Sequence, residues 1–455
     1  MAEPTTAVVP YTRFPLLPGF LLAASASLHL ASAIEGLLGT AVSSGAYFVV
    51  GQFLLSLALI RLYDGKWVLQ DIRLFFVIFF FLYGGTLPLV VLFGLGGATS
   101  GLAGAAFMYG TAFLGFNLVQ WWYRQPWTDV PLEVFDRIRP TFLNTLMLVG
   151  AIGFIAVYAV ALGVEISLTI DHSQVRFLGT QLWVVSMFAI NGFVMYMTAG
   201  WTRLSRVGKF AVVTLALFFI VFQLAMGNRR DFLPMILFAV GVVTTRRKAV
   251  IRTWTMIAGF VAFVAMNALA IIRMIIQDPS ILVRVSPIQI VVTQNEFVSP
   301  IYTLMHYVGA DRALRWGMTY FSAPALFIPR SIWPEKPESL SLQFMRDAFG
   351  TTGLMGFAYT PVTEAFLNFG WVGPFIVFTI LSILMVKLVR NASAHPGLYF
   401  IAFALVIDFN RGDSGGTFYA MMVVGGAYTA MMIASRLRWL PRTTARLWPA
   451  QASRV

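Results

Sequence analysis

Apolar runs of about twenty residues recur along the whole chain, and each is long enough to cross a hydrocarbon core as an α-helix. Lipid offers no hydrogen-bond partner to backbone N–H and C=O groups, so such runs fold as helices that satisfy those groups internally. The composition agrees, because 58% of the 455 residues are hydrophobic and 11% are charged, and the mean hydropathy is +0.79. We therefore expect one all-α, polytopic membrane domain over residues 1–455, with no appended soluble domain.

The boundaries of these runs predict about twelve transmembrane helices. The spans begin near residues 15, 44, 73, 103, 141, 177, 209, 231, 251, 364, 397 and 416. The first run is too long, and its basic flank too weak, for a cleaved signal peptide, so it is expected to remain as the first span. The eighth, from Asp231 to about Thr245, is short for a crossing and is expected to be tilted or partly re-entrant.

Basic residues fall in every second loop, which predicts the orientation, because short loops rich in Lys and Arg stay in the cytoplasm. These loops follow the second, fourth, sixth, eighth and tenth spans, and the C-terminal tail is basic as well: Arg61, Lys66, Arg73; Arg124, Arg137, Arg139; Arg203, Arg206, Lys209; Arg246, Arg247, Lys248, Arg252; Lys387, Arg390; and Arg436, Arg438, Arg442, Arg446. Both termini are therefore predicted to be cytoplasmic. Topology also accounts for the formal charge of +13, and we expect no nucleic-acid partner.

One group of basic residues does not fit this orientation rule. Arg229 and Arg230 fall in the outward loop between the seventh and eighth spans, and Arg411 falls between the eleventh and twelfth. The long outward segment 277–363 adds Arg284, Arg312, Arg315, Arg330, Lys336 and Arg346. A guanidinium fork pairs with two phosphate oxygens at once, so the pattern predicts an anionic ligand at the outer face. The alternative is that these arginines pair with nearby carboxylates or with lipid headgroups.

The segment 277–363 is too apolar and aromatic for a flexible linker. Its stretch "SPIQIVVTQNEFVSPIYTLMHYV", with Glu296 and His306, is typical of a helix that lies along the membrane or dips into it. The following "FSAPALFIPRSIWPEKPES" holds four prolines and is expected to be extended and rigid. Such a shape can hold side chains in fixed positions at the mouth of a site.

Several classes of site are excluded by residue usage. The chain has no cysteine, and its four histidines, His29, His172, His306 and His395, lie far apart, so neither a disulfide nor a protein zinc site is expected. The glycine-rich "GLGGATSGLAG" from Gly94 is interpreted as a short outer turn and not as a phosphate cradle. We expect no metal and no cofactor.

Three motifs in the last third of the chain carry a resemblance to a known family. They comprise Pro329, Arg330, Trp333, Pro334, Lys336 and Pro337; then Glu364, Asn368, Phe369, Gly370 and Gly373; then Arg411 and Gly412. In their order and spacing they resemble the P-R-x-x-W-P-x-K-P, E-x-x-x-N-F-G-x-x-G and R-G elements of Wzy-type O-antigen polymerases, the oligosaccharide repeat-unit polymerases. The front half is similar only in having many spans.

The resemblance implies a glycosyltransferase of the bacterial inner membrane with a GT-C-like architecture and an active site that faces the periplasm. Such enzymes move a growing glycan from undecaprenyl pyrophosphate to the non-reducing end of a fresh lipid-linked repeat unit, in the synthesis of O-antigen lipopolysaccharide or a related polysaccharide. The implied partners are the undecaprenyl-pyrophosphate-linked donor and acceptor and membrane lipid, with a chain-length regulator and a flippase as further candidates. No nucleotide sugar takes part.

The chemistry assigns roles to the charged residues. The departing pyrophosphate gains negative charge, which Arg229, Arg230, Arg330 and Arg411, together with Lys336, are predicted to stabilise. The acceptor hydroxyl must lose a proton, and the preferred base is Glu364 at the start of a span. Glu296 and then His306 are the alternatives, and Glu364 could instead be the ion-pair partner of an arginine. One carboxylate without an obvious nucleophile favours inversion, independent of metal.

Aromatic and amide side chains complete the predicted substrate contacts. Trp333 and Tyr359, with Trp371 and Trp316, are candidates for stacking on sugar rings, although aromatic residues at this depth also anchor proteins at the membrane interface. Asn368 of the second motif is predicted to bind substrate.

Two other functions remain open at the level of sequence. An O-antigen ligase would use the same donor. A flippase or secondary transporter would also suit about twelve spans, although transporters of this size usually show two similar halves, and this chain does not.

Overall fold

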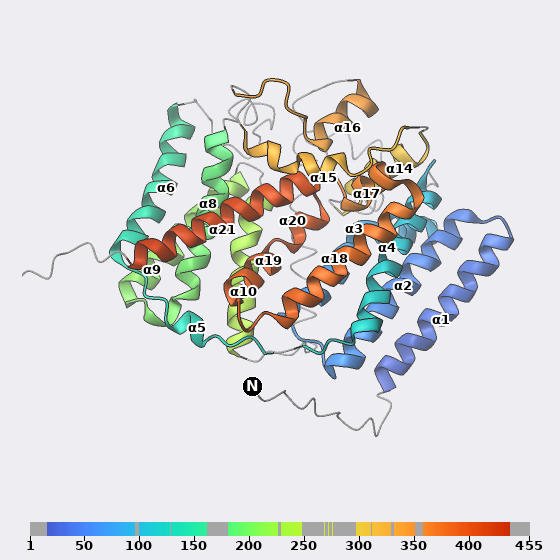
Figure 1. Ribbon diagram of the computed structural model, residues 1–455, viewed down its shortest axis with the longest axis horizontal. Coiled ribbons are helices and arrows are strands. Elements are labelled where there is room, and N and C mark those ends of the chain that lie inside the picture. Colours follow the sequence, from blue (N-terminus) through green and yellow to red (C-terminus); the bar gives the residue numbers. More distant parts are fainter. Residues whose placement is uncertain are drawn as a thin grey trace, which may run out of the picture.

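The computed structural model describes residues 16–95, 100–127, 129–161, 181–225, 229–247, 297–310, 312–328, 332–350 and 358–436, with the single positions 268, 272 and 275. All regular elements in these residues are helices (Figure 1). The all-α prediction is therefore confirmed for the described part of the chain.

Eight helical stretches in the described residues are long and apolar enough to cross a membrane. They are α1 (Leu16–Leu37), α2 (Ala41–Asp64), α3 (Ile72–Leu92), α4 (Leu102–Tyr123), α6 (Phe142–Ala161), α9 (Arg206–Ala225), α17 (Pro361–Phe369) continued through η4 (Gly370–Val372) into α18 (Gly373–Arg390), and α21 (Ser414–Arg436). The protein is thus a helical, multi-pass membrane protein.

Helices also stand at three further positions expected for spans. These are α8 (Gln181–Ala199), the short α10 (Leu233–Arg246), and the pair α19 (Pro396–Ala404) and α20 (Val406–Asn410), which is broken at Leu405. The short α10 agrees with the expected short eighth span. The span expected near residue 251 lies outside the described residues.

Small residues allow the long helices to approach closely. A Cβ added at Gly115 on α4 would meet the carbonyl oxygen of Phe375 on α18, and one added at Gly192 on α8 would meet that of Val424 on α21. Without a hydrophobic force between helices in lipid, such close packing is a main source of their association. One side of the bundle therefore gathers α1, α2, α4 and α18, and the other gathers α6, α8, α9 and α21 (Figure 1).

Polar side chains within the bundle satisfy one another. Asn117 on α4 donates from Nδ2 to Gln52 Oε1 on α2 at 2.9 Å and accepts from Ser56 Oγ at 2.6 Å. His29 Nε2 on α1 lies 3.0 Å from Gln52 Nε2, so this chain of contacts joins three helices. Hydrogen bonds of this kind fix the helices relative to one another because lipid cannot replace them.

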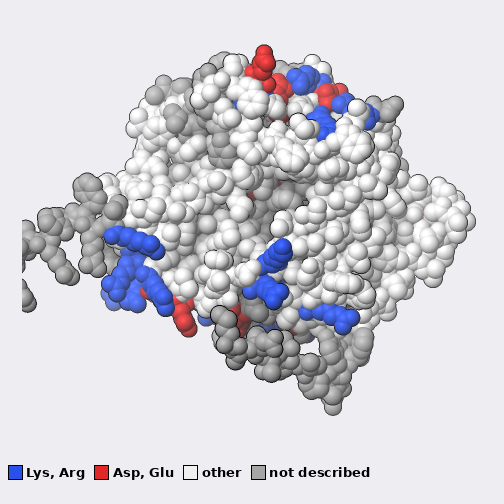
Figure 2. Space-filling view, in the orientation of Figure 1, with Lys and Arg blue, Asp and Glu red and all other residues white. Residues whose placement is uncertain are grey.

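The two ends of the bundle differ in charge. At one end, Arg246 of α10 pairs with Asp136 of the short helix α5 (Glu133–Asp136) at 3.3 Å, and Lys387 and Arg390 end α18. Figure 2 shows mostly blue side chains, with a few red ones, along this lower end, whereas blue and red side chains are mixed at the upper end. We call the lower end the basic end.

The opposite end is covered by short helices. These are α14 (Ser299–Val308), α15 (Met318–Ser322), η3 (Ala323–Phe327), α16 (Leu340–Phe349) and α17, and we call the described residues of 297–369 the crown (Figure 1). Arg411 follows α20 and lies near the start of α21, where Ser414 N donates to Glu364 of α17 at 2.6 Å. The short helix η2 (Arg229–Phe232) lies deeper in the bundle, because the carbonyl of Asp231 accepts a hydrogen bond from Asn191 Nδ2 in the middle of α8 at 2.6 Å. The predicted orientation stays a prediction.

One expectation for the crown is modified. The first half of the four-proline stretch is helical, not extended, because Pro324 stands in the first turn of η3, where a missing N–H costs nothing. The described end of the stretch with Glu296 and His306 forms α14, in which Ile301, Leu304 and Met305 are buried and which packs against α3, α4 and α17.

A buried ionic cluster ties together the loops of the basic end. Arg73 pairs with Asp64 at 2.9 Å and with Asp71 at 2.8 Å, all with fully buried side chains, and donates to the carbonyl of Gln125 at 2.6 Å. The stretch "RLYDGKWVLQDIR" is therefore a structural clamp between the second and third spans.

Replacing Arg73 by Leu is expected to lower the free energy of unfolding by about 3–5 kcal/mol, because two carboxylates stay buried without their cation. The matched control is Arg246→Leu, whose ion pair is partly exposed and is expected to contribute about 0–1 kcal/mol. Titration of the purified protein with SDS measures both. Equal losses in the two variants would contradict the clamp.

Candidate functional site

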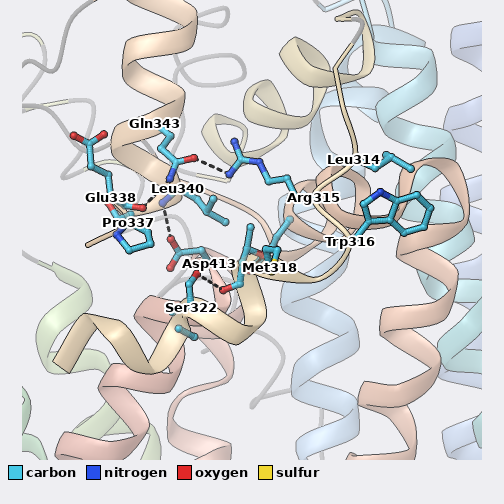
Figure 3. A pocket seen from close by; sticks show the side chains of 15 residues that line it. Leu314, Arg315, Trp316, Met318, Ser322, Pro337, Glu338, Leu340, Gln343 and Asp413 are labelled. Atoms are coloured by element: carbon cyan, nitrogen blue, oxygen red, sulfur yellow. Dashed lines mark hydrogen bonds between the residues drawn. The ribbon is translucent and has the colours of Figure 1, made fainter. Parts of the chain in front are cut away.

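A cavity of about 480 Å³ opens at the crown end (Figure 3). Its wall is built by the loop before α15, by α15 itself, by the start of α16, by α17 and by the start of α21. The described lining carries one cation, Arg315, and three carboxylates, Glu338, Glu364 and Asp413. Residues that precede α18 in the sequence and residues that follow it thus meet around one space.

Glu364 is the most enclosed of these carboxylates, with 1% of the residue exposed. It stands in the first turn of α17, after the N-cap Thr360 and Pro361, where the helix dipole favours negative charge. Oε1 accepts hydrogen bonds from Thr319 Oγ1 at 2.7 Å and Ser414 Oγ at 2.6 Å, and Oε2 accepts from Ser414 N at 2.6 Å. A buried carboxylate held in this way has a fixed orientation toward the cavity.

Asn368 lies one helical turn beyond Glu364 on the same face of α17. Its Nδ2 donates to Thr319 Oγ1 at 2.6 Å and to the carbonyl of Glu364 at 2.8 Å, and its Oδ1 accepts from Gly317 N at 2.9 Å. The residue is fully buried. The structure therefore places Asn368 behind Thr319 as a positioning residue, and not on the cavity wall as the sequence predicted.

The loop before α15 is held against the end of α17 by three consecutive backbone N–H groups. Arg315 N donates to Leu367 O at 3.0 Å, Trp316 N to Asn368 O at 3.0 Å, and Gly317 N to the Asn368 side chain. Trp316 has φ 49° and Gly317 has φ 85°. A left-handed conformation at a bulky residue costs about 1–3 kcal/mol, and these bonds offset that cost.

The loop positions two different side chains along the cavity. The indole of Trp316 is 73% exposed at its rim. The guanidinium of Arg315 donates from Nη1 to Gln343 Oε1 on α16 at 2.7 Å. Figure 3 shows Trp316 on one side of the cavity, Gln343, Asp413 and Glu338 on the other, and Arg315 between Trp316 and Gln343.

Asp413 connects two helices at the far end of the cavity. Its Oδ1 accepts from Gly416 N at 2.7 Å, as an N-cap side chain does at the start of α21. Its Oδ2 accepts from Leu340 N at 3.1 Å at the start of α16. The carboxylate therefore fixes α16 relative to α21.

The arginines predicted for the site are only partly described. Arg411 ends α20 at the crown end and is not among the lining residues. Arg229 and Arg230 lie in η2, which packs beside the middle of α8 through the contact of Asp231 O with Asn191. Their side chains lie outside the described part, as do Arg330 and Glu296. A shared cavity for this whole set stays a prediction.

Two of the outward arginines pair with nearby carboxylates, which was the alternative to binding an anionic ligand. Arg312 pairs with Asp347 at 2.7 Å, and Arg346 pairs with Glu338 at 2.9 Å. Lys336 is 8% exposed and donates from Nζ to the carbonyl of Ile328 at 2.7 Å, within the proline-rich segment.

The remaining predicted residues lie at different depths. Trp333 is 41% and Trp371 53% exposed, and neither lines the cavity. Tyr359 is buried among Tyr307, Leu340, Phe344 and Leu367 in the core of the crown. The structure thus places it as a packing residue.

Thr319, Gln343, Asp413 and Ser414 were not among the residues predicted for the site, and Arg315 was noted only as an outward arginine. Asp413 and Ser414 directly follow the Arg411–Gly412 element at the start of a helix, so their position was a usable signal. Thr319 and Gln343 carry no such signal, because their roles arise from tertiary contacts.

Comparison with protein-family models, with curated proteins and with solved structures gave no match. The geometry of the site and the sequence motifs therefore carry the argument about function.

His306 gives the crown a pH dependence. It lies on α14 between the rings of Tyr307 and of Phe344 on α16. Burial, and then the charge of Arg312, lowers the pKa of His306 below its ordinary value of 6.5, while Asp347 opposes this. The folded protein therefore binds this proton more weakly than the unfolded chain does. The contribution of neutral His306 to the free energy of unfolding is therefore fully present above pH 6.5. It is lost as the pH falls from 6.5 through the lowered pKa of the folded protein.

We expect acidification from about pH 7.5 to about pH 5 to lower the thermal unfolding midpoint more in the wild type than in His306→Phe, which keeps a ring but cannot be protonated. Thermal unfolding of the two purified proteins across this range tests the difference. Parallel pH profiles would show that His306 does not contribute.

Proposed function

We propose that this protein is a glycosyltransferase that polymerises lipid-linked oligosaccharide repeat units. In this proposal it has about twelve spans and a GT-C-like architecture in a bacterial inner membrane, with both termini in the cytoplasm. The crown faces the periplasm, since the basic end is the one that the positive-inside rule assigns to the cytoplasm. The donor and the acceptor are glycans carried on undecaprenyl pyrophosphate.

The observation that carries the proposal is the position of Glu364. The motif that resembles the polymerase family places a glutamate at the start of a span, and this glutamate lines the cavity at the crown end. The asparagine of the same motif holds the Thr319 hydroxyl that donates to this carboxylate. Two motif residues thus form one structural unit beside a space of the size that small-molecule ligands occupy, about 300–1,000 Å³.

In the proposed reaction the acceptor hydroxyl enters the cavity and gives its proton to Glu364. Its oxygen forms a bond to C1 of the donor glycan as the bond between C1 and the pyrophosphate oxygen breaks, so the glycan is transferred with inversion. Undecaprenyl pyrophosphate leaves with the bonding electrons. Fixed cations lower the barrier where this charge develops, and Arg229, Arg230, Arg330, Arg411 and Lys336 are the candidates.

Glu364→Gln removes the base and keeps its size, so we expect polymerisation to slow by about 10²–10⁴-fold. The matched control is Glu133→Gln, an exposed carboxylate on α5 at the basic end, which is expected to retain full activity. The measurement is the ladder of polymer lengths made by a deletion strain that carries each variant at equal membrane abundance. A normal ladder from Glu364→Gln would exclude it as the base.

Arg330→Ala and Arg411→Ala are each expected to lower the polymerisation rate by about 10²–10³-fold, the range for loss of one group that stabilises transition-state charge. Arg312→Ala is the matched control, because Arg312 is a partly exposed arginine of the crown that pairs with Asp347, and neither residue lines the cavity. Rates with purified lipid-linked substrate separate the three variants. Unchanged long-chain polymer in both test variants would refute the arginine assignment.

The same deletion strain discriminates the alternative functions. Loss of a polymerase leaves lipid A core with a single repeat unit, loss of a ligase leaves bare core, and loss of a flippase leaves repeat units on the cytoplasmic face. Only the first result agrees with the proposal.

A further inference from the structure

We infer that the cavity is the subsite for the acceptor sugar, and that it takes an uncharged or amino-substituted sugar ring stacked on Trp316 while excluding acidic sugars. This inference rests on the proposed function for the identity of the ligand as a glycan. It adds which of the two substrates the cavity holds and what charge that substrate carries.

The first observation is the charge of the lining. Three carboxylates and one arginine face the space in the described residues. Glu338 is paired with Arg346 outside the lining, so Glu364 and Asp413 carry the argument against an anionic ligand. Hydrogen bonds hold both Glu364 and Asp413 in place. Ser414 donates to Glu364, and two backbone N–H groups donate to Asp413. Neither carboxylate can therefore turn away from an incoming anion. The pyrophosphate, or a sugar that carries a carboxylate, would meet like charges at short range. The diphosphate is therefore bound beside the cavity, and the acceptor is bound within it.

The second observation is the conformation of Trp316. The loop holds this residue in the left-handed region through bonds to the end of α17, and the result is an indole that is 73% exposed at the rim. Backbone strain maintained by surrounding contacts is concentrated at binding and active sites. A rigid aromatic face beside planar hydrogen-bonding groups, here Arg315 and Gln343, suits a sugar ring, which has apolar faces and polar edges.

The two observations combine along the cavity. Trp316 lies on one side of the cavity and Asp413 and Glu338 on the other, with Arg315 between Trp316 and Gln343 (Figure 3). Glu364 belongs to the acidic side because it accepts hydrogen bonds from Ser414, the neighbour of Asp413. In this inference a ring stacked on Trp316 presents its hydroxyls toward that side. An ammonium group on that sugar would be favoured at the acidic side, and a carboxylate would not.

The test is direct binding of simple sugars to the full chain in lipid nanodiscs. The probes are the methyl glycosides of glucose, galactose and mannose, each with its uronic-acid and 2-amino counterparts, and saturation-transfer NMR measures their affinity. At least one neutral glycoside, and its amino counterpart, is expected to bind about tenfold more tightly than the matching uronide.

Substitutions distinguish the contribution of the Trp316 ring to sugar binding from the contribution of the charged residues. Trp316→Asn keeps a residue that tolerates positive φ but removes the ring, and it is expected to weaken binding of the neutral glycoside about tenfold. Trp371→Ala removes an exposed tryptophan outside the cavity and is expected to change nothing. Glu338→Gln should narrow the preference for the neutral sugar over the uronide, and Arg315→Gln should widen it.

Three results would overturn the inference: a uronide that binds as tightly as its neutral partner, equal losses in Trp316→Asn and Trp371→Ala, or no saturable binding of any glycoside. The assay contains no lipid-linked donor and forms no polymer. A failure of the polymerase proposal in the deletion strain is therefore distinguishable from a failure of this one.

Discussion

The contact between Glu364 and Ser414 determines much of the geometry at the crown end. A carboxylate that is almost fully buried is costly unless its oxygens are satisfied, and here one serine supplies both its backbone N–H and its hydroxyl. That serine begins α21, and the glutamate lies in the first turn of α17, so the two helices start close to each other. Thr319 completes the carboxylate's partners and brings α15 to the same place. The cavity is enclosed because three elements converge on one side chain.

The class of fold and part of the site could be predicted from the sequence. Apolar runs of crossing length specify helices because no other single-segment structure satisfies its backbone in lipid. Glu364 and Asn368 stand four residues apart in a helical stretch, so a common face follows from helical periodicity, and the structure brings both to the cavity region. The positions of α10 and α21 also follow from the apolar pattern.

Other features depend on tertiary contacts that the sequence does not display. Trp316 adopts positive φ because three N–H groups of its loop find acceptors on α17, not because of any turn signature. Pro324 begins a helix where four prolines predicted extended chain. Tyr359 has an aromatic side chain of the kind that stacks on sugar rings, yet it packs in the core of the crown. Arginines could be counted from the sequence, but their division into paired ones, such as Arg312, and one that lines the cavity, Arg315, required coordinates.

Helix α21 is held at three levels along its length. Ser414 holds its start at Glu364, the Gly192 contact holds its middle against α8, and Asn144 of α6 donates to the carbonyl of Met431 near its end at 2.8 Å. A helix held at three levels cannot turn about its axis, or shift along it, without loss of at least one of these contacts. The position of Ser414, and with it the orientation of the Glu364 carboxylate, is therefore tied to the packing of α21 against α6 and α8.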